Sequence, residues 1–239
     1  MERLTNALKA MQIPFNEAQV KKLYAYMQGI LEWNEKINLT AIKEEDDFIK
    51  KHYIDSFFLY KHIYAEKPNK IIDVGTGGGF PGIPLAIICP DIAFTLMDSL
   101  KKRLNVIDTL CKELEIKNVK TLHGRAEDLG RITEYRENFD ICVSRAVANL
   151  STLSEYCLPF VKVGGKFIAM KGPELENEIF EGKKAIKILG GSIDGEFNTQ
   201  DTCFKEYDHR ILVVEKNQKT QNFFPRRAGT PSKEPLGKK

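Results

Sequence analysis

The sequence contains no long hydrophobic run. Its longest apolar stretch, residues 83–89, is interrupted by Pro84 and followed by Pro90, whereas a helix that spans a bilayer needs about 20 apolar residues. The N-terminal segment MERLTNALKA carries Glu2 and no apolar segment follows it, so the features of a secretory signal are missing. These absences argue against a membrane-spanning or secreted protein, and we expect a cytoplasmic location.

Cysteine and histidine are few and scattered. The cysteines form no CxxC pair, and the histidines show no metal-ligand spacing. Structural zinc sites use closely paired ligands, so we expect no metal site. Several cysteines lie among apolar neighbours, which favours buried, reduced thiols. The residues concerned are Cys89, Cys111, Cys142, Cys157 and Cys203, with His52, His62, His123 and His209.

Net charge is low, at +3 for 239 residues, and the positive charge is concentrated in the C-terminal tail, residues 218–239. The tail from residue 225 onward contains five cations and one anion: Arg226, Arg227, Lys233, Lys238, Lys239 and Glu234. Its bias toward Pro, Gly, Lys and Arg predicts a segment that is mobile on its own. Such a tail favours a polyanionic partner such as RNA, although a merely solubilising end also fits.

The pattern of apolar residues changes once along the chain. Residues 1–66 read as a helical cap, with Asn16 as an N-cap and Gln19 three residues later. After the break at residues 67–69, short β-branched runs alternate with amphipathic helices, which predicts a parallel sheet with crossover helices over residues 67–217. Strands are expected at 70–74, 93–97, 119–123, 140–144, 166–170, 191–197 and 210–215, with helices notably at 100–114 and 153–160.

Five glycines lie between two apolar segments in IIDVGTGGGFPGIPLAI, residues 71–87. A strand that ends in Asp73, then glycines, then an apolar run is the context in which a glycine loop binds a nucleotide-like ligand, because the ligand can lie on the bare backbone. Two spacings coexist there, one through Gly75, Gly77 and Gly79 and one that reaches Gly82. The second is the dinucleotide pattern.

The residues around this loop favour a cationic ligand over a pyrophosphate. Phe80 and Pro81 stand where a pyrophosphate needs backbone N–H donors, and proline has none. Asp73 would attract a sulfonium or an ammonium group, and S-adenosylmethionine carries both. Asp98 ends the next strand as a ribose-binding carboxylate should, in either ligand class, or it caps the helix that follows. An NAD-dependent oxidoreductase therefore stays an alternative.

Four cations are predicted to rim one edge of the sheet. Ligands of open α/β sheets bind at the carboxyl ends of the strands. Arg125, Arg145 and Lys171 each follow a predicted strand, and Arg210 reaches the same edge if the last strand is antiparallel. Each one alone could be an ordinary surface charge. Together they favour a phosphate-rich partner, since the guanidinium fork binds two phosphate oxygens.

The chain resembles the bacterial 16S rRNA guanine-N7 methyltransferase family, also known as glucose-inhibited division protein B. The matching stretches are WN at 33–34, NLT at 38–40, HYIDS at 52–56, DVGTG at 73–77, FPGIP at 80–84, SRA at 144–146, KG at 171–172 and PRRAGTP at 225–231. The resemblance implies a Rossmann-like class I methyltransferase with a seven-stranded, mostly parallel sheet and an antiparallel last strand. It also implies S-adenosylmethionine as donor and a guanine of small-subunit rRNA as acceptor.

The resemblance further implies roles for particular residues. Those expected at the donor are Gly75, Gly77, Phe80, Ala126, Glu127 and Arg145, to which the loop argument adds Asp73, Gly79 and Asp98. Those expected at the RNA are Arg125, Arg145, Lys171, Arg210, Arg226 and Arg227. Gly78 departs from the family, whose members often carry proline there. Guanine N7 has a free lone pair, so no catalytic acid or base is assigned. We expect a monomer, and a non-catalytic rRNA-binding assembly factor remains the other alternative.

Overall fold

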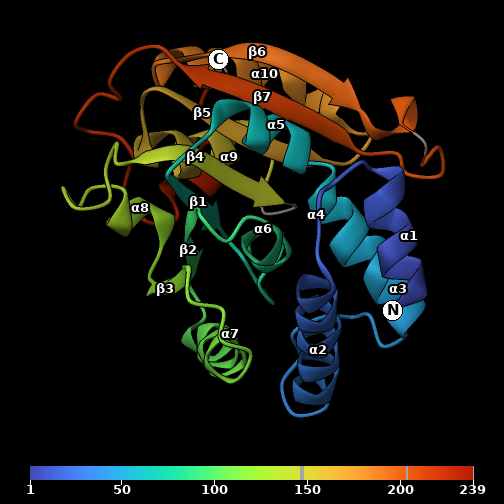
Figure 1. Ribbon diagram of the computed structural model, residues 1–239. Helices are drawn as coiled ribbons and strands as arrows, with labels where there is room; N and C mark the ends of the chain where they lie inside the picture. The colour runs from blue at the N-terminus through green and yellow to red at the C-terminus, as the bar shows by residue number, and fades with distance from the viewer. Residues whose placement is uncertain (146–147, 203, 239) are drawn as a thin grey trace.

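The computed structural model describes residues 1–145, 148–202 and 204–238. Three residues named above, Ala146, Cys203 and Lys239, therefore lie outside the described parts. A group of helices opens the chain and a seven-stranded sheet with its own helices follows (Figure 1).

The N-terminal helices are α1 (Glu2–Ala10), α2 (Glu17–Asn34), α3 (Glu45–Phe48), a π-helical segment (Ile49–Ile54), α4 (Asp55–Phe57) and α5 (Tyr60–Glu66). The predicted cap of α2 is confirmed. Asn16 accepts a hydrogen bond from the Gln19 backbone, and the Gln19 side chain accepts one from the Asn16 backbone. This reciprocal capping box fixes where α2 begins. Figure 1 places these helices on one side of the sheet, beside α6.

The sheet has the strand order β3-β2-β1-β4-β5-β7-β6. Its strands are β1 (Lys70–Val74), β2 (Ala93–Asp98), β3 (Val119–His123), β4 (Phe139–Arg145), β5 (Val161–Lys171), β6 (Gly191–Asn198) and β7 (Arg210–Lys216). All pairs from β3 to β5 are parallel, whereas β7 runs antiparallel to both β5 and β6. The predicted sheet and its reversed last strand are confirmed.

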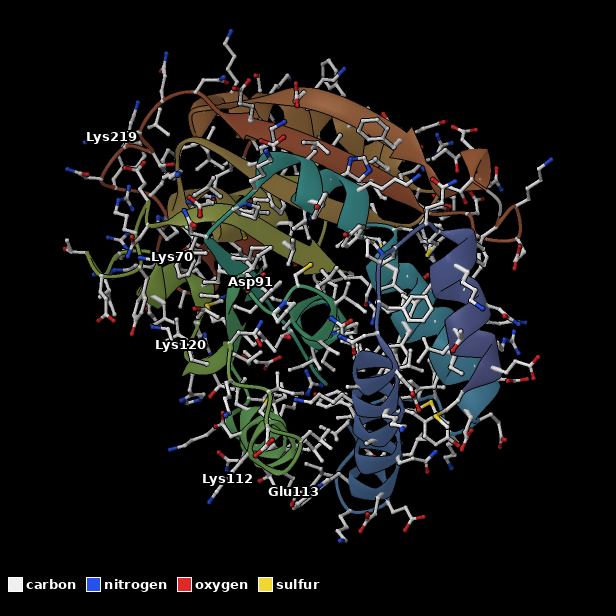
Figure 2. The ribbon with its side chains drawn as sticks, in the orientation of Figure 1. Lys70, Asp91, Lys112, Glu113, Lys120 and Lys219 are labelled. Atoms are coloured by element: carbon white, nitrogen blue, oxygen red, sulfur yellow. The ribbon has the colours of Figure 1, made fainter. Side chains whose placement is uncertain are left out.

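The remaining helices cover both faces of the sheet. They are α6 (Gly82–Ile88), α7 (Lys101–Glu113), α8 (Ala126–Leu129), α9 (Leu150–Cys157), α10 (Leu175–Ile188) and α11 (Thr230–Lys233), with short 3-10 turns at Leu158–Phe160 and Thr199–Asp201. Successive strand residues point to opposite faces, so Ile71 joins the core under the N-terminal helices, α6 and α7, and Ile72 joins the core under α9 and α10. Charged side chains such as Lys112 and Glu113 project outward (Figure 2).

The prediction of a mobile tail is wrong. Arg136 donates hydrogen bonds to the backbone carbonyls of Thr220 and Phe224, and the Phe224 ring is buried. Further along, Thr152 donates to the carbonyl of Pro231. Composition reflects only the tail's own residues, whereas the groups that hold the tail in place lie far away in the sequence.

Cys89, Cys111, Cys142 and Cys157 are free and buried. Within the described residues, no group of three or more His, Cys, Asp or Glu side chains is arranged to hold a metal ion. No helix in the same part of the chain is both long and apolar enough to cross a membrane.

Candidate donor and acceptor cavities

The glycine loop turns sharply at the end of β1. Gly75 and Gly77 have positive φ angles of 77° and 59°, which residues with a Cβ rarely adopt. The backbone N–H groups of Gly75 and Thr76 both donate to the Met97 carbonyl on β2. Gly77 donates its N–H to Oδ2 of Asp98, 2.9 Å away. The loop is thus fastened to the end of the neighbouring strand.

Asp73 lies beneath the loop. Its side chain is fully buried, and Oδ2 accepts hydrogen bonds from the Thr76 hydroxyl at 2.7 Å and the Gly82 N–H at 2.9 Å. Burial raises the pKa of Asp73 to about 7, against the lowering effect of these two donors. Asp73 therefore holds the two ends of the loop together, and it does not line the described cavities.

We predict that replacing Asp73 by Asn changes how stability depends on pH. The folded pKa of about 7 exceeds the unfolded value of about 3.9, so the folded state binds more protons between these values. The free energy of unfolding of the wild type therefore falls as pH rises through this window, and the whole loss is present above pH 7. From pH 5 to pH 8 the wild type should lose roughly 2–3 kcal/mol relative to Asp73→Asn. Urea unfolding of both proteins at both pH values measures this, and identical pH dependence would contradict it.

A cavity of about 530 Å³ opens above the ends of β1, β2 and β3. Two buried carboxylates, Asp98 and Glu127, lie in its wall. Asp98 binds two backbone groups, because Oδ2 accepts from the Gly77 N–H of the glycine loop and Oδ1 accepts from the Leu100 N–H immediately before α7. Its ribose-binding role stays a prediction. The other lining residues are Val74, Gly75, Met97, Ser99, Arg103, Gly124, Arg125, Ala126, Arg145, Tyr156, Gly229 and Ser232. We call this the donor cavity.

The C-terminal tail forms one wall of the donor cavity. Glu127 accepts a hydrogen bond from the Gly229 N–H at 2.9 Å, and Ser232 also lines the space. Arg226 holds this part of the tail in place through an ion pair with both carboxylate oxygens of Glu155, whose side chain is fully buried. Sequence reasoning missed this arrangement, although the PRRAGTP stretch was among the matching motifs.

A second cavity of about 410 Å³ lies on the other side of Arg145. Gly75 and Arg145 line both cavities. The other lining residues are Leu39, Thr40, Lys51, His52, Asp55, Thr76, Gly77, Gly78, Phe80, Met170, Lys171, Gly172 and His209. We call this the acceptor cavity. Two ligands could therefore meet over the end of β1.

Arg145 is fixed by three partners between the two cavities. Its guanidinium donates to the Lys51 carbonyl at 2.6 Å, to Nδ1 of His52 at 2.9 Å and to Oδ2 of Asp55 at 3.4 Å. Phe80 lies beneath it, 5.8 Å from the guanidinium carbon to the ring centre. Burial lowers the pKa of Arg145, and Asp55 acts in the opposite direction. Because its planar guanidinium is held by these contacts, Arg145 forms a rigid wall between the two cavities.

Comparison with known proteins assigns this geometry to a family. The family model described as rRNA small subunit methyltransferase G matches residues 19–199. A protein of that name from Clostridium tetani is 49% identical over 233 residues, which cover 98% of this chain and 97% of the relative. Its counterpart from Alkaliphilus oremlandii is 47% identical with the same coverage. The chain belongs to the rRNA small subunit methyltransferase G family. The resemblance inferred from the motifs is confirmed.

Solved structures agree on the fold. An O-methyltransferase from Bacillus cereus, solved in complex with SAH, superposes with a TM-score of 0.57 at 18% identity, over 85% of this chain and 93% of that one. A putative O-methyltransferase from Klebsiella pneumoniae gives 0.54 at 14% identity, over 90% and 96%. Identities this low show the fold alone. This member of the rRNA small subunit methyltransferase G family has the Rossmann-like class I methyltransferase fold.

The fold brings some of the expected site residues together and separates others. Arg125, Ala126, Glu127, Asp98, Gly75 and Arg145 line the donor cavity, and Gly77, Phe80 and Lys171 line the acceptor cavity. Arg210 lies beside Lys171 at the same edge, as the reversed strand predicts, but its side chain pairs with Glu176 and Glu196. Arg227 is exposed on the tail.

Gly79 lies under the loop and belongs to its packing. A Cβ at this position, where φ is +94°, would clash with the hydroxyl of Tyr26 and lie 2.7 Å from Cγ1 of Ile83. Tyr26 in turn donates a hydrogen bond to the Gly78 carbonyl at 2.9 Å. The N-terminal helix α2 therefore supports the loop directly, a role for which the sequence offered no sign beyond an apolar position on a helix.

Proposed function

We propose that the chain transfers a methyl group from S-adenosylmethionine to N7 of a guanine in the 530-loop region of 16S rRNA. The observation that carries this proposal is the junction of the donor and acceptor cavities at Gly75 and Arg145. A methyl transfer needs its two reactants in line and in contact, and a shared opening between two cavities supports that arrangement. The proposed acceptor agrees with the family to which the chain belongs.

The residues of the donor cavity suit S-adenosylmethionine. Backbone is bare at Gly75, and the carboxylates of Asp98 and Glu127 offer acceptors for ribose hydroxyl and amino groups. Gly77 lines the acceptor cavity, and a Cβ there would meet no atom within 4 Å, so open space also lies above the loop on that side. When bound, the donor supplies an electrophilic methyl group on a sulfonium. These residues would hold it, while Asp73 and Asp98 keep the glycine loop in shape.

The side chains of the acceptor cavity position a base and need not move a proton. Guanine N7 attacks with a lone pair, so holding the purine in place is the main requirement. Lys171 is tied to the Ala148 carbonyl at 2.7 Å and to Glu178 at 2.8 Å, which makes it part of the wall. Arg125 and the exposed Arg227 are the cations proposed to meet RNA phosphates. An rRNA acceptor supports a cytoplasmic location, and we propose that the protein acts there as a monomer.

Methyl transfer with a labelled donor tests the proposal. The protein is incubated with radiolabelled S-adenosylmethionine and small ribosomal subunits from cells that lack it, and the modified nucleotide is mapped. We expect a single labelled guanine in the 530-loop region. No transfer to subunits or to naked 16S rRNA, despite salt-sensitive RNA binding, would instead support a non-catalytic assembly factor. Thermal denaturation gives the matching control for an oxidoreductase, since S-adenosylhomocysteine and not NADH should raise the melting temperature.

A further inference from the structure

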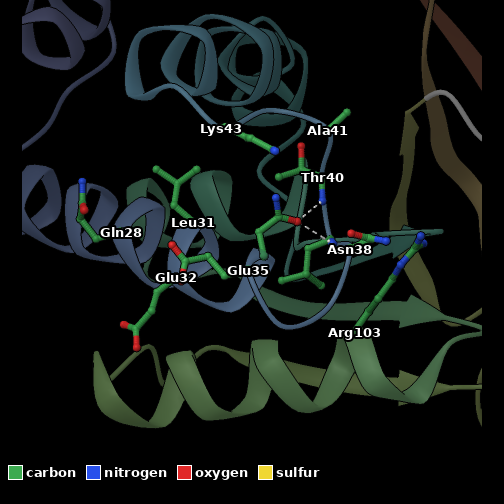
Figure 3. Close-up of a pocket in the computed structure, with 11 residues that line it drawn as sticks. Gln28, Leu31, Glu32, Glu35, Asn38, Thr40, Ala41, Lys43 and Arg103 are labelled. Atoms are coloured by element: carbon green, nitrogen blue, oxygen red, sulfur yellow. Dashed lines mark hydrogen bonds between the residues drawn. The ribbon is translucent and has the colours of Figure 1, made fainter.

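The loop that follows α2 is held rigidly at Thr40. Oδ1 of Asn34 accepts hydrogen bonds from the backbone N–H groups of Leu39 at 2.8 Å and Thr40 at 2.9 Å, the two dashed lines in Figure 3. Thr40 lines the acceptor cavity, and it also lines the neighbouring cavity of about 1070 Å³ drawn in Figure 3. The WN and NLT stretches of the sequence thus fix one side chain at the edge of the acceptor cavity.

The tautomer of His52 follows from its contact with Arg145. A guanidinium can only donate, so Nδ1 of His52, 2.9 Å from Arg145, must accept. Burial and the neighbouring positive charge of Arg145 lower the pKa of His52 to about 3, so the ring is neutral. A neutral imidazole that accepts at Nδ1 carries its proton at Nε2. His52 therefore donates from Nε2 to the Thr40 hydroxyl oxygen, 3.0 Å away.

This donation leaves the hydroxyl proton of Thr40 as the one hydrogen-bonding group of that hydroxyl that is not used. A threonine hydroxyl has two acceptor lone pairs and one donor proton. One lone pair accepts from His52 and the other from the Ile42 N–H at 3.1 Å. Among residues 1–145, 148–202 and 204–238, the hydroxyl proton has no acceptor. While His52 and Ile42 donate to its two lone pairs, the Thr40 hydroxyl can act only as a donor toward a further partner.

We propose that the Thr40 hydroxyl donates a hydrogen bond to O6 of the acceptor guanine and so selects guanine over adenine, with His52 as the positioning residue that fixes this direction. The proposal rests on the proposed function and deepens it. O6 lies beside N7 on the same edge of guanine, so a purine whose N7 faces the donor cavity presents O6 nearby. Adenine carries an amino group at that place, and it would bring a second donor against Thr40.

The nearby cations already bind other groups of the protein. Lys51 is engaged with Asp47 at 2.8 Å, and Lys171 with Glu178. Arg145 is engaged with Lys51, His52 and Asp55. A neutral hydroxyl also suits the reaction better than a cation, because N7 gains positive charge as the methyl group arrives.

Base analogues combined with Thr40 variants test the proposal. Synthetic RNA of the 530-loop region carries guanine, hypoxanthine or 2-aminopurine at the acceptor position. The first two bases have O6, and 2-aminopurine keeps N7 but lacks O6. Methyl transfer, as kcat/KM, is measured for wild type, Thr40→Val and Thr40→Ser. Thr40→Val removes the hydroxyl at nearly constant shape, and Thr40→Ser restores it.

The expected result is a loss that depends on the base. Thr40→Val should lower kcat/KM by roughly tenfold to a hundredfold on guanine and hypoxanthine, the range for a buried donor or acceptor left unpaired. On 2-aminopurine the same variant should change it by less than about threefold, and Thr40→Ser should stay near wild type on all three bases. Equal losses on all three bases would assign Thr40 a structural role and overturn the proposal. Failure of the wild type both on the guanine RNA and on small ribosomal subunits would overturn the proposed function itself.

Discussion

Gly79→Ala is expected to destabilise the protein by roughly 2–6 kcal/mol, the sum of about 1–3 kcal/mol for backbone strain and about 1–3 kcal/mol for overpacking. The glycine has φ +94°, and a Cβ there would run into Tyr26 and Ile83, both fully buried. Tyr26 cannot swing away without breaking its bond to the Gly78 carbonyl. Urea unfolding measures the loss, and methyl transfer should fall with it as the loop deforms.

Gly77→Ala is the matched control for this prediction. Gly77 also has a positive φ, +59°, but no atom lies within 4 Å of a Cβ placed there. The cost in stability should therefore be only about 1–2 kcal/mol, the penalty for a left-handed residue. Gly77 lines the acceptor cavity, so a side chain there would take up space that the reactants need, and activity should fall by roughly tenfold or more. If the two variants lost equal stability, the packing role assigned to Gly79 would be wrong.

Arg226→Ala is expected to cost about 3–5 kcal/mol, because it leaves the fully buried carboxylate of Glu155 without its charged partner. The effect should reach the donor cavity, since the segment that Arg226 anchors ends at Gly229 and Ser232 in the cavity wall. Calorimetry should accordingly show weaker binding of S-adenosylhomocysteine. This expectation differs from the RNA-binding role first proposed for Arg226.

Arg227→Ala provides the comparison one residue away. Arg227 is exposed, so its loss should change stability by less than about 0.5 kcal/mol. Binding to rRNA should weaken, and the slope of log affinity against log salt should fall by about one phosphate contact.

A double-mutant cycle of Arg226→Ala and Glu155→Ala completes the test of the buried pair. A coupling energy near zero between positions 155 and 226 would contradict that pair.

Local sequence signals predicted the fold well and the site in part. The short β-branched runs led to the parallel sheet, and the glycine loop led to a ligand over the end of β1. Asp98, Glu127 and Arg145 line the cavities as expected. The purpose of Asp73 was misjudged, because a strand pattern does not show whether an acid at the strand's end faces a ligand or the turn beneath it.

The remaining errors and omissions share one cause. Arg226 reaches Glu155 across 71 positions, and Arg145 reaches His52 across 93. No periodicity or spacing within one segment can reveal partners so far apart in the chain. The HYIDS and NLT stretches did stand out as family motifs, yet only the fold shows that His52 and Thr40 meet.

The place of Gly229 in the wall beside Glu127 has a consequence for shortened forms of the protein. All seven strands precede position 217, so a stop codon at position 228 would leave every strand of the sheet in place. The same stop codon would remove Gly229 and Ser232, and the donor cavity would then be open on one side.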